Sequence, residues 1–389
     1  MTAYCKKQTK EVAVYSLENA FKSLFEINMG VVPGERILVF SDIVRPGEEL
    51  SPSEADRRRR LLEVAREAAT FADKVFGNCS FISFDATAAS GAEPPEALWR
   101  GAFGDSVVEM LKTEEIFHAL LAKKATAEQL ARAEEIVLAG GQSVVKVVIA
   151  LSNNSTSHTR FRSLLNQAGC RFASLPHFDP EMFFTSMRVD WHQLSERTNR
   201  LAERINRAVE IRVESGNGTH MKFGKRGRTA AGDDGLLTAP GSFGNLPAGE
   251  VYLAPVEGTS EGVMVLEYAP MRKLSSPLRL IVRDGKVSDI LGDEPFRAFL
   301  EDKFALSPLN RNIAELGIGT NDRASRPDNI LEAEKILGTI HIALGDNSSF
   351  GGTVSTPFHE DYVFYGPTVT AILEDGTTDL LLDKGKLVI

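Results

Sequence analysis

Residues 16–42 read SLENAFKSLFEINMGVVPGERILVFSD, and their pattern indicates the architecture of the first half of the chain. Apolar residues recur at helical spacing over 16–29, and the turn dipeptide Pro33-Gly34 separates them from an apolar run over 36–40 that ends at Asp42. A helix followed by a short apolar strand is one αβ unit. The stretch therefore predicts a sheet with helices packed on it.

The same alternation continues to about residue 205. The pattern predicts helices over 53–72, 117–122, 157–168 and 190–208, and strands over 80–84, over 144–151 and just before residue 175. Short apolar strands separated by helices are typical of a mostly parallel sheet covered on both faces. We therefore expect residues 1–205 to form an α/β domain.

From residue 209 onward the pattern changes to short strand-like runs broken by Gly, Pro, Asp and Asn. The turn dipeptides Asp284-Gly285, Asp375-Gly376 and Lys384-Gly385 lie between such runs, as they do in β-hairpins. Residues 206–389 are therefore expected to form a second, β-rich antiparallel domain.

Composition excludes several classes of protein. The 389 residues carry a net charge of −9, and neutralising a nucleic-acid backbone requires a basic face. The one strong basic run, Arg57 to Arg60, lies in a predicted helix and is interpreted as its solvated face. No stretch approaches the roughly 18 apolar residues of a membrane span, and the first residues lack the plan of a signal peptide. We expect a cytoplasmic protein that binds neither nucleic acid nor membrane.

The cysteines give no sign of a site. Cys5, Cys79 and Cys170 are too few and too scattered for a disulfide framework or a thiolate metal site. We expect them to be buried or idle thiols.

Chemistry-bearing residues gather in residues 332–364, EAEKILGTIHIALGDNSSFGGTVSTPFHEDYVF. His341 lies in the middle of an apolar strand pattern, where a polar ring needs a partner. His359 and Asp361 form an H-x-D pair, and their side chains point the same way on an extended chain, so both can reach one ion. A lone histidine in a strand is more often a hydrogen-bonded core residue, and H-x-D also arises by chance. Their joint occurrence indicates a metal site.

Two glutamates join this set on other grounds. Glu250 follows a turn in GSFGNLPAGEVYLAP and begins a predicted strand, whereas Glu315 lies in the apolar stretch NIAELGIGTN. Burying an unpaired carboxylate costs several kcal/mol, so both need cationic or hydrogen-bonding partners. The alternatives are a surface position for Glu250 and an arginine-paired structural carboxylate for Glu315.

The donor types restrict the metal. Two imidazoles with carboxylates favour Zn, Mn, Co or Fe(II) over Ca or Mg, which prefer oxygen ligands. Three carboxylates exceed what one catalytic zinc usually takes, so a bridged pair of metals about 3.5–4 Å apart is a further expectation.

At these residues the chain resembles the thermophilic aminopeptidases, the aminopeptidase T and aminopeptidase S family of dinuclear metallopeptidases. The resemblance covers nearly the whole chain and rests on four blocks in order, NLPAGEV, AELGIG, HIALG and HED. It implies metal ligation by Glu250, Glu315, His341, His359 and Asp361, with one glutamate bridging one or two ions of Zn, Co or Mn. It also implies a barrel-like second domain, a homodimer and a small peptide substrate hydrolysed by a metal-activated water, with Glu250 in a catalytic role.

The chain departs from that family at one functional position. The peptidases place a tyrosine shortly after the HIALG block, where this chain has Asn347 and Ser348. The gap from His341 to His359 is also shorter than in the peptidases, which implies a trimmed loop. Tyr362 and Tyr365 lie close enough in sequence to substitute, and Tyr362 is our candidate for the missing catalytic tyrosine. His158 is assigned no metal role.

Two alternatives stay open. Iron-dependent 2,5-dihydroxypyridine ring-cleaving dioxygenases resemble this chain in the same histidine and H-x-D blocks. His341, His359 and Asp361 would supply the two histidines and one carboxylate usual for an Fe(II) oxygenase that acts on a small molecule. A binding or scaffold protein that keeps the fold without catalysis is the other alternative, and intact ligand residues argue against it.

Overall fold

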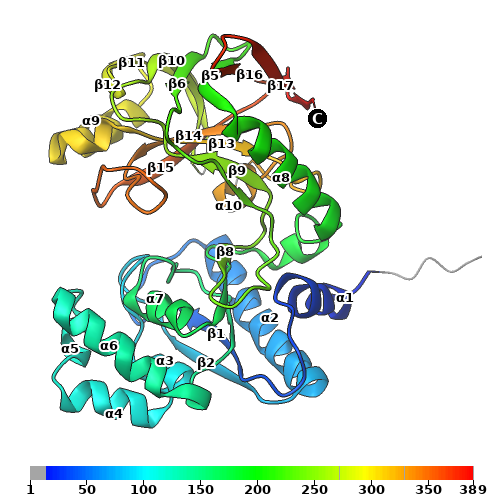
Figure 1. The fold of residues 1–389 in the computed structure, drawn as a ribbon, viewed down its shortest axis with the longest axis vertical. Helices are drawn as coiled ribbons and strands as arrows, with labels where there is room; N and C mark the ends of the chain where they lie inside the picture. The colour runs from blue at the N-terminus through cyan, green and yellow to red at the C-terminus, as the bar shows by residue number, and fades with distance from the viewer. Residues whose placement is uncertain (1–14, 271, 328, 389) are drawn as a thin grey trace, which may run out of the picture.

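The computed structural model describes residues 15–270, 272–327 and 329–388. Figure 1 shows two lobes, one blue to green-cyan and the other green to red, with α8 (Trp191–Asn206) on the side of the second lobe. None of the described helices is long and apolar enough to cross a membrane.

The first lobe alternates helices and strands in chain order. Its elements are α1 (Leu17–Lys22) with a following π-helical turn (Ser23–Asn28), β1 (Ile37–Ile43), α2 (Pro52–Phe76), β2 (Cys79–Asp85), α3 (Glu96–Phe103), α4 (Asp105–Thr113), α5 (Phe117–Leu121), α6 (Ala127–Ala139), β3 (Val147–Ala150), α7 (Arg160–Gln167) and β4 (Arg171–Ser174). Helix α8 follows and packs in the core of the second lobe through Leu201 and Ile205.

The sheet of this lobe has the order β2-β1-β3-β4-β8, in which β8 (Phe243–Asn245) comes later in the chain, and every pair in it is parallel. Alternation along β1 divides its side chains between two cores. Ile37 and Val39 pack with α1 and α2, whereas Leu38 and Phe40 pack with residues of α3 to α7. This confirms the parallel sheet covered on both faces.

Three helices of this lobe, α3, α4 and α6, are absent from the sequence expectations. Gly104, with a φ of 88°, separates α3 from α4 and breaks their apolar pattern into short pieces. Helix α6 has a capping box, because the Thr126 side chain accepts from the Gln129 N–H and the Gln129 side chain accepts from the Thr126 N–H. That Thr-x-x-Gln signal was readable in the sequence.

The basic run on α2 differs in part from the expectation of a solvated face. Arg59 is exposed and pairs with Asp56 and Glu63. Arg58, however, is 2% exposed and pairs with Glu48, so the expectation is wrong for this residue. A buried guanidinium needs such a partner.

The cysteines behave as expected where they are described. Cys79 is half-buried, Cys170 is buried and both thiols are free, while Cys5 lies outside the described residues. Burial raises the pKa of Cys79 to about 12, which leaves its thiol protonated and unreactive.

The second lobe is rich in antiparallel strands. Its elements are β5 (Ala208–Glu214), β6 (His220–Gly224), β7 (Ala231–Asp233), β9 (Glu250–Leu253), β10 (Glu261–Ala269), β11 (Arg272–Arg283), β12 (Lys286–Leu291), α9 (Phe296–Leu306), β13 (Ile313–Gly319), α10 (Ile330–Ala333), β14 (Ile340–Gly345), β15 (His359–Phe364), β16 (Thr368–Leu373), β17 (Thr378–Asp383) and β18 (Lys386–Leu387).

These strands form two sheets that share one core. The larger has the order β12-β11-β10-β6-β5-β16-β17-β18 and the smaller β15-β14-β13-β9-β7. Leu316 and Ile342 of the smaller sheet pack in the same core as Phe223 and Leu280 of the larger one. The opposite face of the smaller sheet is therefore free to carry polar side chains.

The division near residue 205 stays a prediction, and the structure adds one crossing segment. Strand β8 (Phe243–Asn245) comes after that position but pairs in parallel with β4 of the first lobe. The chain then returns to begin β9 at Glu250. This return path places Glu250 beside the junction of the lobes.

Candidate metal centre

The register of the smaller sheet brings the five predicted ligands to one face. Glu250 lies opposite Gly319, and His341 lies opposite Gly317. Glu315 and Asp361 both lie opposite Ala343, and His359 lies opposite Gly345. Directly opposed residues point to the same side of a sheet, so donors from four strands share one surface with small residues between them.

Gly317 is what lets the His341 ring lie across this surface. A Cβ added at Gly317 would fall 2.0 Å from ring atoms of His341. Any larger residue would therefore displace the imidazole. His341 is 1% exposed, so its ring has no other direction in which to move freely.

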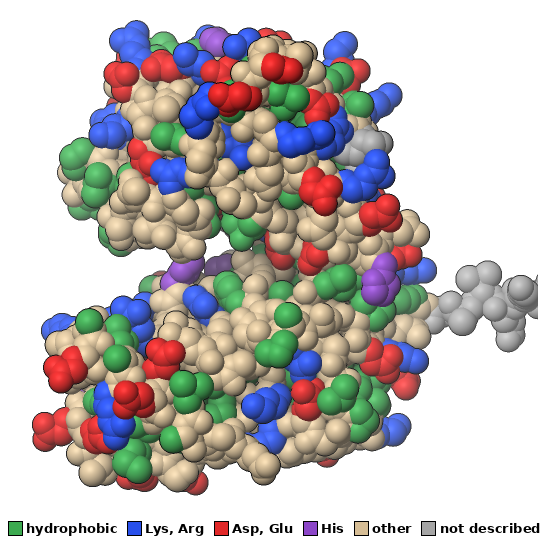
Figure 2. All heavy atoms as spheres, in the orientation of Figure 1, with side chains coloured by type: hydrophobic (Ala, Val, Ile, Leu, Met, Phe, Trp, Pro, Cys, Tyr) green, Lys and Arg blue, Asp and Glu red, His purple; other side chains and the backbone are tan. Residues whose placement is uncertain are grey.

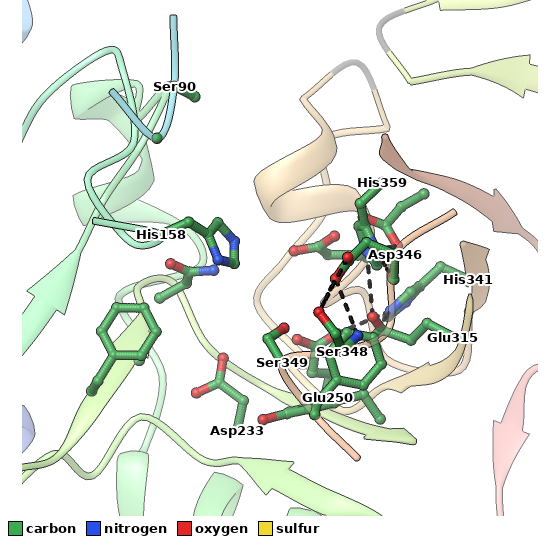
Figure 3. A pocket seen from close by; sticks show the side chains of 18 of the residues that line it. Ser90, His158, Asp233, Glu250, Glu315, His341, Asp346, Ser348, Ser349 and His359 are labelled. Carbon is green, nitrogen blue, oxygen red and sulfur yellow. Dashed lines mark hydrogen bonds and ion pairs between the residues drawn. The ribbon is translucent and has the colours of Figure 1, made fainter. Parts of the chain in front are cut away.

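The Glu315 carboxylate lies between the two imidazoles. Its Oε1 is 3.3 Å from Nε2 of His341, and its Oε2 is 3.5 Å from Nε2 of His359. His341 Nε2 is also 3.3 Å from Glu250 Oε2, and His359 Nε2 is 3.7 Å from Asp361 Oδ1. The ring nitrogens and the carboxylates thus converge, as Figure 3 shows for the labelled members of the set.

Three groups of described residues have ligand atoms within 4.8 Å of one another. They are Glu250 with Glu315 and His341, Glu315 with His359 and Asp361, and Glu334 with His341 and Asp361. Each group contains one histidine, and Glu315 belongs to two of them. Glu315 therefore links the two halves of the cluster.

Contacts with residues outside the ligand set orient the ring of His359. Nδ1 of His359 lies 2.7 Å from the carbonyl oxygen of Asp346, which directs Nε2 toward Glu315 and Asp361. The ring of Phe350 packs edge-on against that of His359. A carbonyl partner on the far nitrogen is the usual way in which a protein fixes a ligating imidazole.

The cluster fits a divalent transition metal. Glu250 Oε2, His341 Nδ1 and Asp361 Oδ1 are buried and form no hydrogen bond with any residue that the structure describes. Buried polar atoms without partners are rare and costly, and a cation would satisfy the two carboxylate oxygens. Imidazole with carboxylate is also a donor set suited to Zn, Mn, Co and Fe(II).

The carboxylates of the cluster raise the pKa of His341 and of His359, so both imidazoles keep their protons. Burial alone would lower the pKa of the imidazoles, but the hydrogen bond to Glu315 and the charges of Glu250 and Asp361 raise the pKa of His341 to about 10. Asp361 and Glu315 raise that of His359 to about 10 as well. Burial opposes ionisation of Asp361, yet His359 lowers its pKa to about 2. The same negative charge would hold a metal in place of those protons.

A buried cation lies at one side of the cluster. The Nζ of Lys335 is 2.5 Å from Glu250 Oε1 and 2.7 Å from Glu334 Oε1. Burial would lower the pKa of Lys335, but the charges of Glu250, Glu334 and Asp233 raise it well above its ordinary value. Burial also raises the pKa of Asp233 to about 8 and of Glu334 to about 7.

The donor face forms one wall of a cleft between the lobes, with a volume of about 1170 Å³. The other wall comes from the first lobe and from β8. It includes Ser90, Lys123, His158, Phe243 and Asn245. Figure 2 shows the hollow with histidine atoms at its opening, and in Figure 3 His158 faces the donor cluster from the opposite side.

The loop after β14 closes one end of the cleft. Ser348, Ser349 and Phe350 line the cavity. Asn347 is fully buried beneath them, accepts from the Val354 N–H and donates to Glu257. This is the loop in which the resemblance to the peptidases led us to look for a tyrosine.

Tyr362 does not lie where a catalytic tyrosine would. It is 1% exposed in the core of the second lobe, and its hydroxyl donates to Glu360. The reason is strand alternation: His359 and Asp361 face the cleft, so Tyr362 faces the opposite side. The expectation of a catalytic Tyr362 is corrected by this position.

Three residues of the site were missed by the sequence reasoning. Asp233 lies opposite Glu250 in β7, and Glu334 and Lys335 directly follow α10. Glu334 and Lys335 stand in the quoted segment just before His341, so adjacent opposite charges in an apolar stretch were an available signal. Asp233 had none, because its proximity depends on pairing across the sheet.

Two solved structures resemble the whole chain. A 2,5-dihydroxypyridine dioxygenase from Pseudomonas putida KT2440 has a TM-score of 0.66 at 18% identity, covering 96% of both chains. Wild-type AmpT from Thermus thermophilus has a TM-score of 0.58 at 14% identity, covering 96% of this chain and 99% of that one. At these identities the likeness shows a shared fold alone. The fold and the donor face together define the class, which is a two-lobed protein with a candidate metal site.

The sequence comparisons narrow this class. The NicX family, described as 2,5-dihydroxypyridine 5,6-dioxygenase, matches residues 107–388, which is more than half of the chain. The chain belongs to that family. A curated relative, the 2,5-dihydroxypyridine 5,6-dioxygenase of Pseudomonas putida KT2440, is 26% identical over 172 residues. That match covers 40% of this chain and 48% of the relative, or about half of its length.

These findings correct the expected activity. The family match and the curated relative are dioxygenases, so the assignments as a hydrolase, an aminopeptidase and a zinc enzyme are wrong. The resemblance to aminopeptidases holds only for the fold, through AmpT. From the sequence we attributed the histidine and H-x-D blocks to both families, so these blocks could not separate the two reactions. A dioxygenase implies a metal cofactor, and the donor cluster is a possible site for it.

Proposed function

We propose that this protein is an Fe(II)-dependent dioxygenase that opens the ring of a hydroxylated nitrogen heterocycle of the 2,5-dihydroxypyridine type. The observation that carries the proposal is the joint presence of two imidazoles and Asp361 on one face of the cleft, in a chain of the dioxygenase family. Two histidines and one carboxylate are the usual protein ligands of non-haem Fe(II) oxygenases.

His341, His359 and Asp361 would hold the iron, with Glu315 able to serve as a further oxygen ligand. When bound, Fe(II) supplies the one-electron chemistry through which molecular oxygen reacts with an aromatic ring. The Nδ1 contact of His359 to the Asp346 carbonyl would keep that ring aimed at the ion. Glu250, paired with Lys335, would stay beside the centre.

Other cleft residues would orient the substrate. Asp233 lines the cavity, and with a pKa of about 8 its carboxyl is mostly protonated at neutral pH and can donate a hydrogen bond to a ring oxygen or nitrogen. His158 and Lys123 lie across the cleft from the donor face. They would contact the edge of the ring that points away from the metal.

Oxygen consumption tests the proposal. Purified protein reconstituted with Fe(II) under anaerobic conditions is mixed with 2,5-dihydroxypyridine, and oxygen uptake and loss of the ring absorbance are followed together. The wild type is expected to consume one oxygen molecule for each ring opened. His359→Ala should lower the rate about 100-fold or more, since loss of even an outer-shell partner costs roughly 10–100-fold.

The matched control is His220→Ala, because His220 is an exposed histidine of β6 in the same lobe. That variant should retain the wild-type rate. Iron-loaded protein that leaves both oxygen and dihydroxypyridine unchanged would remove the proposal. We further propose that the chain divides into two domains near residue 205. We also propose that it forms a homodimer, which light scattering of the purified chain would test.

A further inference from the structure

Tyr252 places a hydroxyl on the donor face of the smaller sheet. It lies two residues after Glu250 in β9, so both side chains point to the same side of the strand. In the sheet it lies opposite Gly317, which also lies opposite His341. Among the tyrosines that the structure describes, only Tyr252 lines the cleft. Its phenol therefore borders the space that a substrate would occupy.

The Tyr252 hydroxyl forms no hydrogen bond with any residue in the described part of the chain. The hydroxyl of Tyr362, in contrast, donates to Glu360. On the sheet, Tyr252 has Gly317 on one side and Ala231 on the other, and these small residues leave room around its ring. A phenol hydroxyl is protonated at neutral pH and usually finds a partner when it is recessed. The hydroxyl of Tyr252 is therefore available to a bound molecule.

The ring of Phe350 holds that of Tyr252 in place. The two rings pack edge to face, with their centroids 5.9 Å apart and their planes at 82°. Phe350 makes a second contact of the same kind with His359, at 5.9 Å and 90°. Aromatic pairs of this geometry are stabilising beyond the burial of their surface. Phe350 thus fixes the tyrosine relative to one of the candidate metal ligands.

The loop that carries Phe350 is itself held at its base. The Asn347 carbonyl accepts from the N–H groups of Phe350 and Gly352, at 3.4 Å and 2.9 Å. The Asn347 side chain accepts from the Val354 N–H at 2.9 Å and donates to Glu257 at 3.0 Å. A Cβ on Gly352 would fall 1.9 Å from the Asn347 side chain, so the two sides of the loop lie in close contact. A loop tied in this way is organised before a substrate binds.

We propose that Tyr252 recognises the substrate: its hydroxyl donates a hydrogen bond to one ring oxygen, while the opposite ring oxygen lies among the metal ligands. The inference rests on the proposed function and adds the residue that would select a ring with two oxygens. In the strand order β15-β14-β13-β9, Gly317 separates Tyr252 from His341, and His359 lies further away on β15. The hydroxyl therefore approaches the ring from beside the ligand set. The two oxygens of 2,5-dihydroxypyridine stand on opposite sides of its ring and suit such a pair of contacts.

The consequence concerns substrate preference. A site built to hydrogen-bond a substrate oxygen rejects an analogue that lacks it, because a recessed polar group then loses its partner. A ring with a single oxygen would satisfy the metal ligands and leave the Tyr252 hydroxyl unpaired. Tyr252 would thus set the preference for a dihydroxylated ring over a monohydroxylated one.

Binding without turnover tests the inference. Protein loaded with Mn(II) is kept free of oxygen, and calorimetry measures its affinity for 2,5-dihydroxypyridine and for 3-hydroxypyridine, which has one ring oxygen. Tyr252→Phe removes only the hydroxyl. It should weaken the binding of dihydroxypyridine about tenfold, the cost of one hydrogen bond. The binding of 3-hydroxypyridine and the Mn(II) content should not change.

The matched control is Tyr268→Phe. Tyr268 lies in β10 of the same lobe, where its ring packs against Tyr365 and not in the cleft. This variant should bind both compounds as the wild type does. Equal affinity of the wild type and Tyr252→Phe for dihydroxypyridine would overturn the inference. An equal loss of affinity for both compounds would overturn it too, because the variant would then be disturbing the metal site.

Oxygen uptake separates this inference from the proposed function. If Tyr252→Phe loses affinity as expected but the iron-loaded wild type takes up no oxygen, the proposed function fails and the inference stands. If the wild type turns over and both proteins bind dihydroxypyridine equally, the inference fails and the proposed function stands. A wild type that binds neither compound would remove both.

Discussion

At the scale of single residues, the predicted ligands meet because strand alternation is readable from sequence. His359 and Asp361 were paired on the argument that residues two apart share a face, and the structure places both on the cleft wall. The same argument, applied one residue further, puts Tyr362 in the core. Asp233 and Lys335 could not be found in this way, because their place depends on which strands pair and on a close approach at Gly319.

Gly317 gives a residue-scale prediction. Gly317→Ala should push the His341 ring out of position, because its Cβ would fall 2.0 Å from ring atoms. We expect a loss of about 1–3 kcal/mol in the free energy of unfolding from overpacking, together with weaker Mn(II) binding. Urea unfolding and a metal titration measure the two effects.

Gly216→Ala is the control for that change. Gly216 is exposed in the second lobe, and a Cβ there meets no atom within 4 Å. Its metal affinity should equal that of the wild type. If Gly317→Ala keeps wild-type metal affinity, the ring of His341 is not a ligand.

At the scale of elements, sequence periodicity found most strands and the two longest helices, α2 and α8, because each has a continuous apolar pattern. It missed α6. It also missed α3 and α4, where glycine interrupts that pattern. The loop after β14 was expected only to be short. Its buried Asn347, which accepts from Val354 and donates to Glu257, depends on contacts with another strand connection and has no local signature.

Asp179 ties elements of both lobes together. It caps the short helix over Pro180–Phe184 and pairs with Arg60 of α2 at 3.1 Å and with Arg326 of the second lobe at 2.9 Å. Burial opposes its ionisation, but the Glu181 N–H and both arginines lower its pKa below the ordinary value. The carboxylate therefore stabilises the fold above the unfolded pKa of about 3.9, and this contribution is lost as pH falls through the lower folded pKa.

Asp179→Asn should lower the free energy of unfolding by about 1–2 kcal/mol at neutral pH, since it removes partly exposed charged hydrogen bonds. The difference from wild type should begin to shrink below about pH 4, the unfolded pKa, and disappear as pH falls through the lower folded pKa, where the folded carboxylate also becomes neutral. Urea titrations at neutral and acid pH measure the free energy of unfolding of both proteins. The control is Asp302→Asn, at an exposed aspartate of α9. An equal difference at both pH values would contradict the account.

At the scale of the whole molecule, the site is a cleft with one wall from each lobe, and that arrangement could not be read from periodicity. The crossing of β8 into the parallel sheet brings Phe243 and Asn245 to the cavity. It also sets the start of β9, and so Glu250, at the junction. The sequence predicted two units of the right kind, but gave no sign that His158 of the first would face the ligands of the second.

His158→Ala tests that second wall. If His158 contacts the substrate, the variant should raise KM about tenfold, the cost of one hydrogen bond, and leave the metal content unchanged. Steady-state oxygen uptake over a range of substrate concentrations gives KM and kcat separately. His118→Ala, an exposed histidine on α5 of the same lobe, is the control. An unchanged KM would mean that the first lobe does not hold the ring.

The central claim is that oxygen gas, and not water, supplies the atoms added to a hydroxylated pyridine ring. Iron-loaded protein is incubated with 2,5-dihydroxypyridine under isotopically labelled oxygen gas, and the mass of the product is measured by mass spectrometry. Two labelled atoms in the ring-opened product are predicted. A product that carries oxygen from the solvent alone would contradict the account, because it would show that the centre performs hydrolysis.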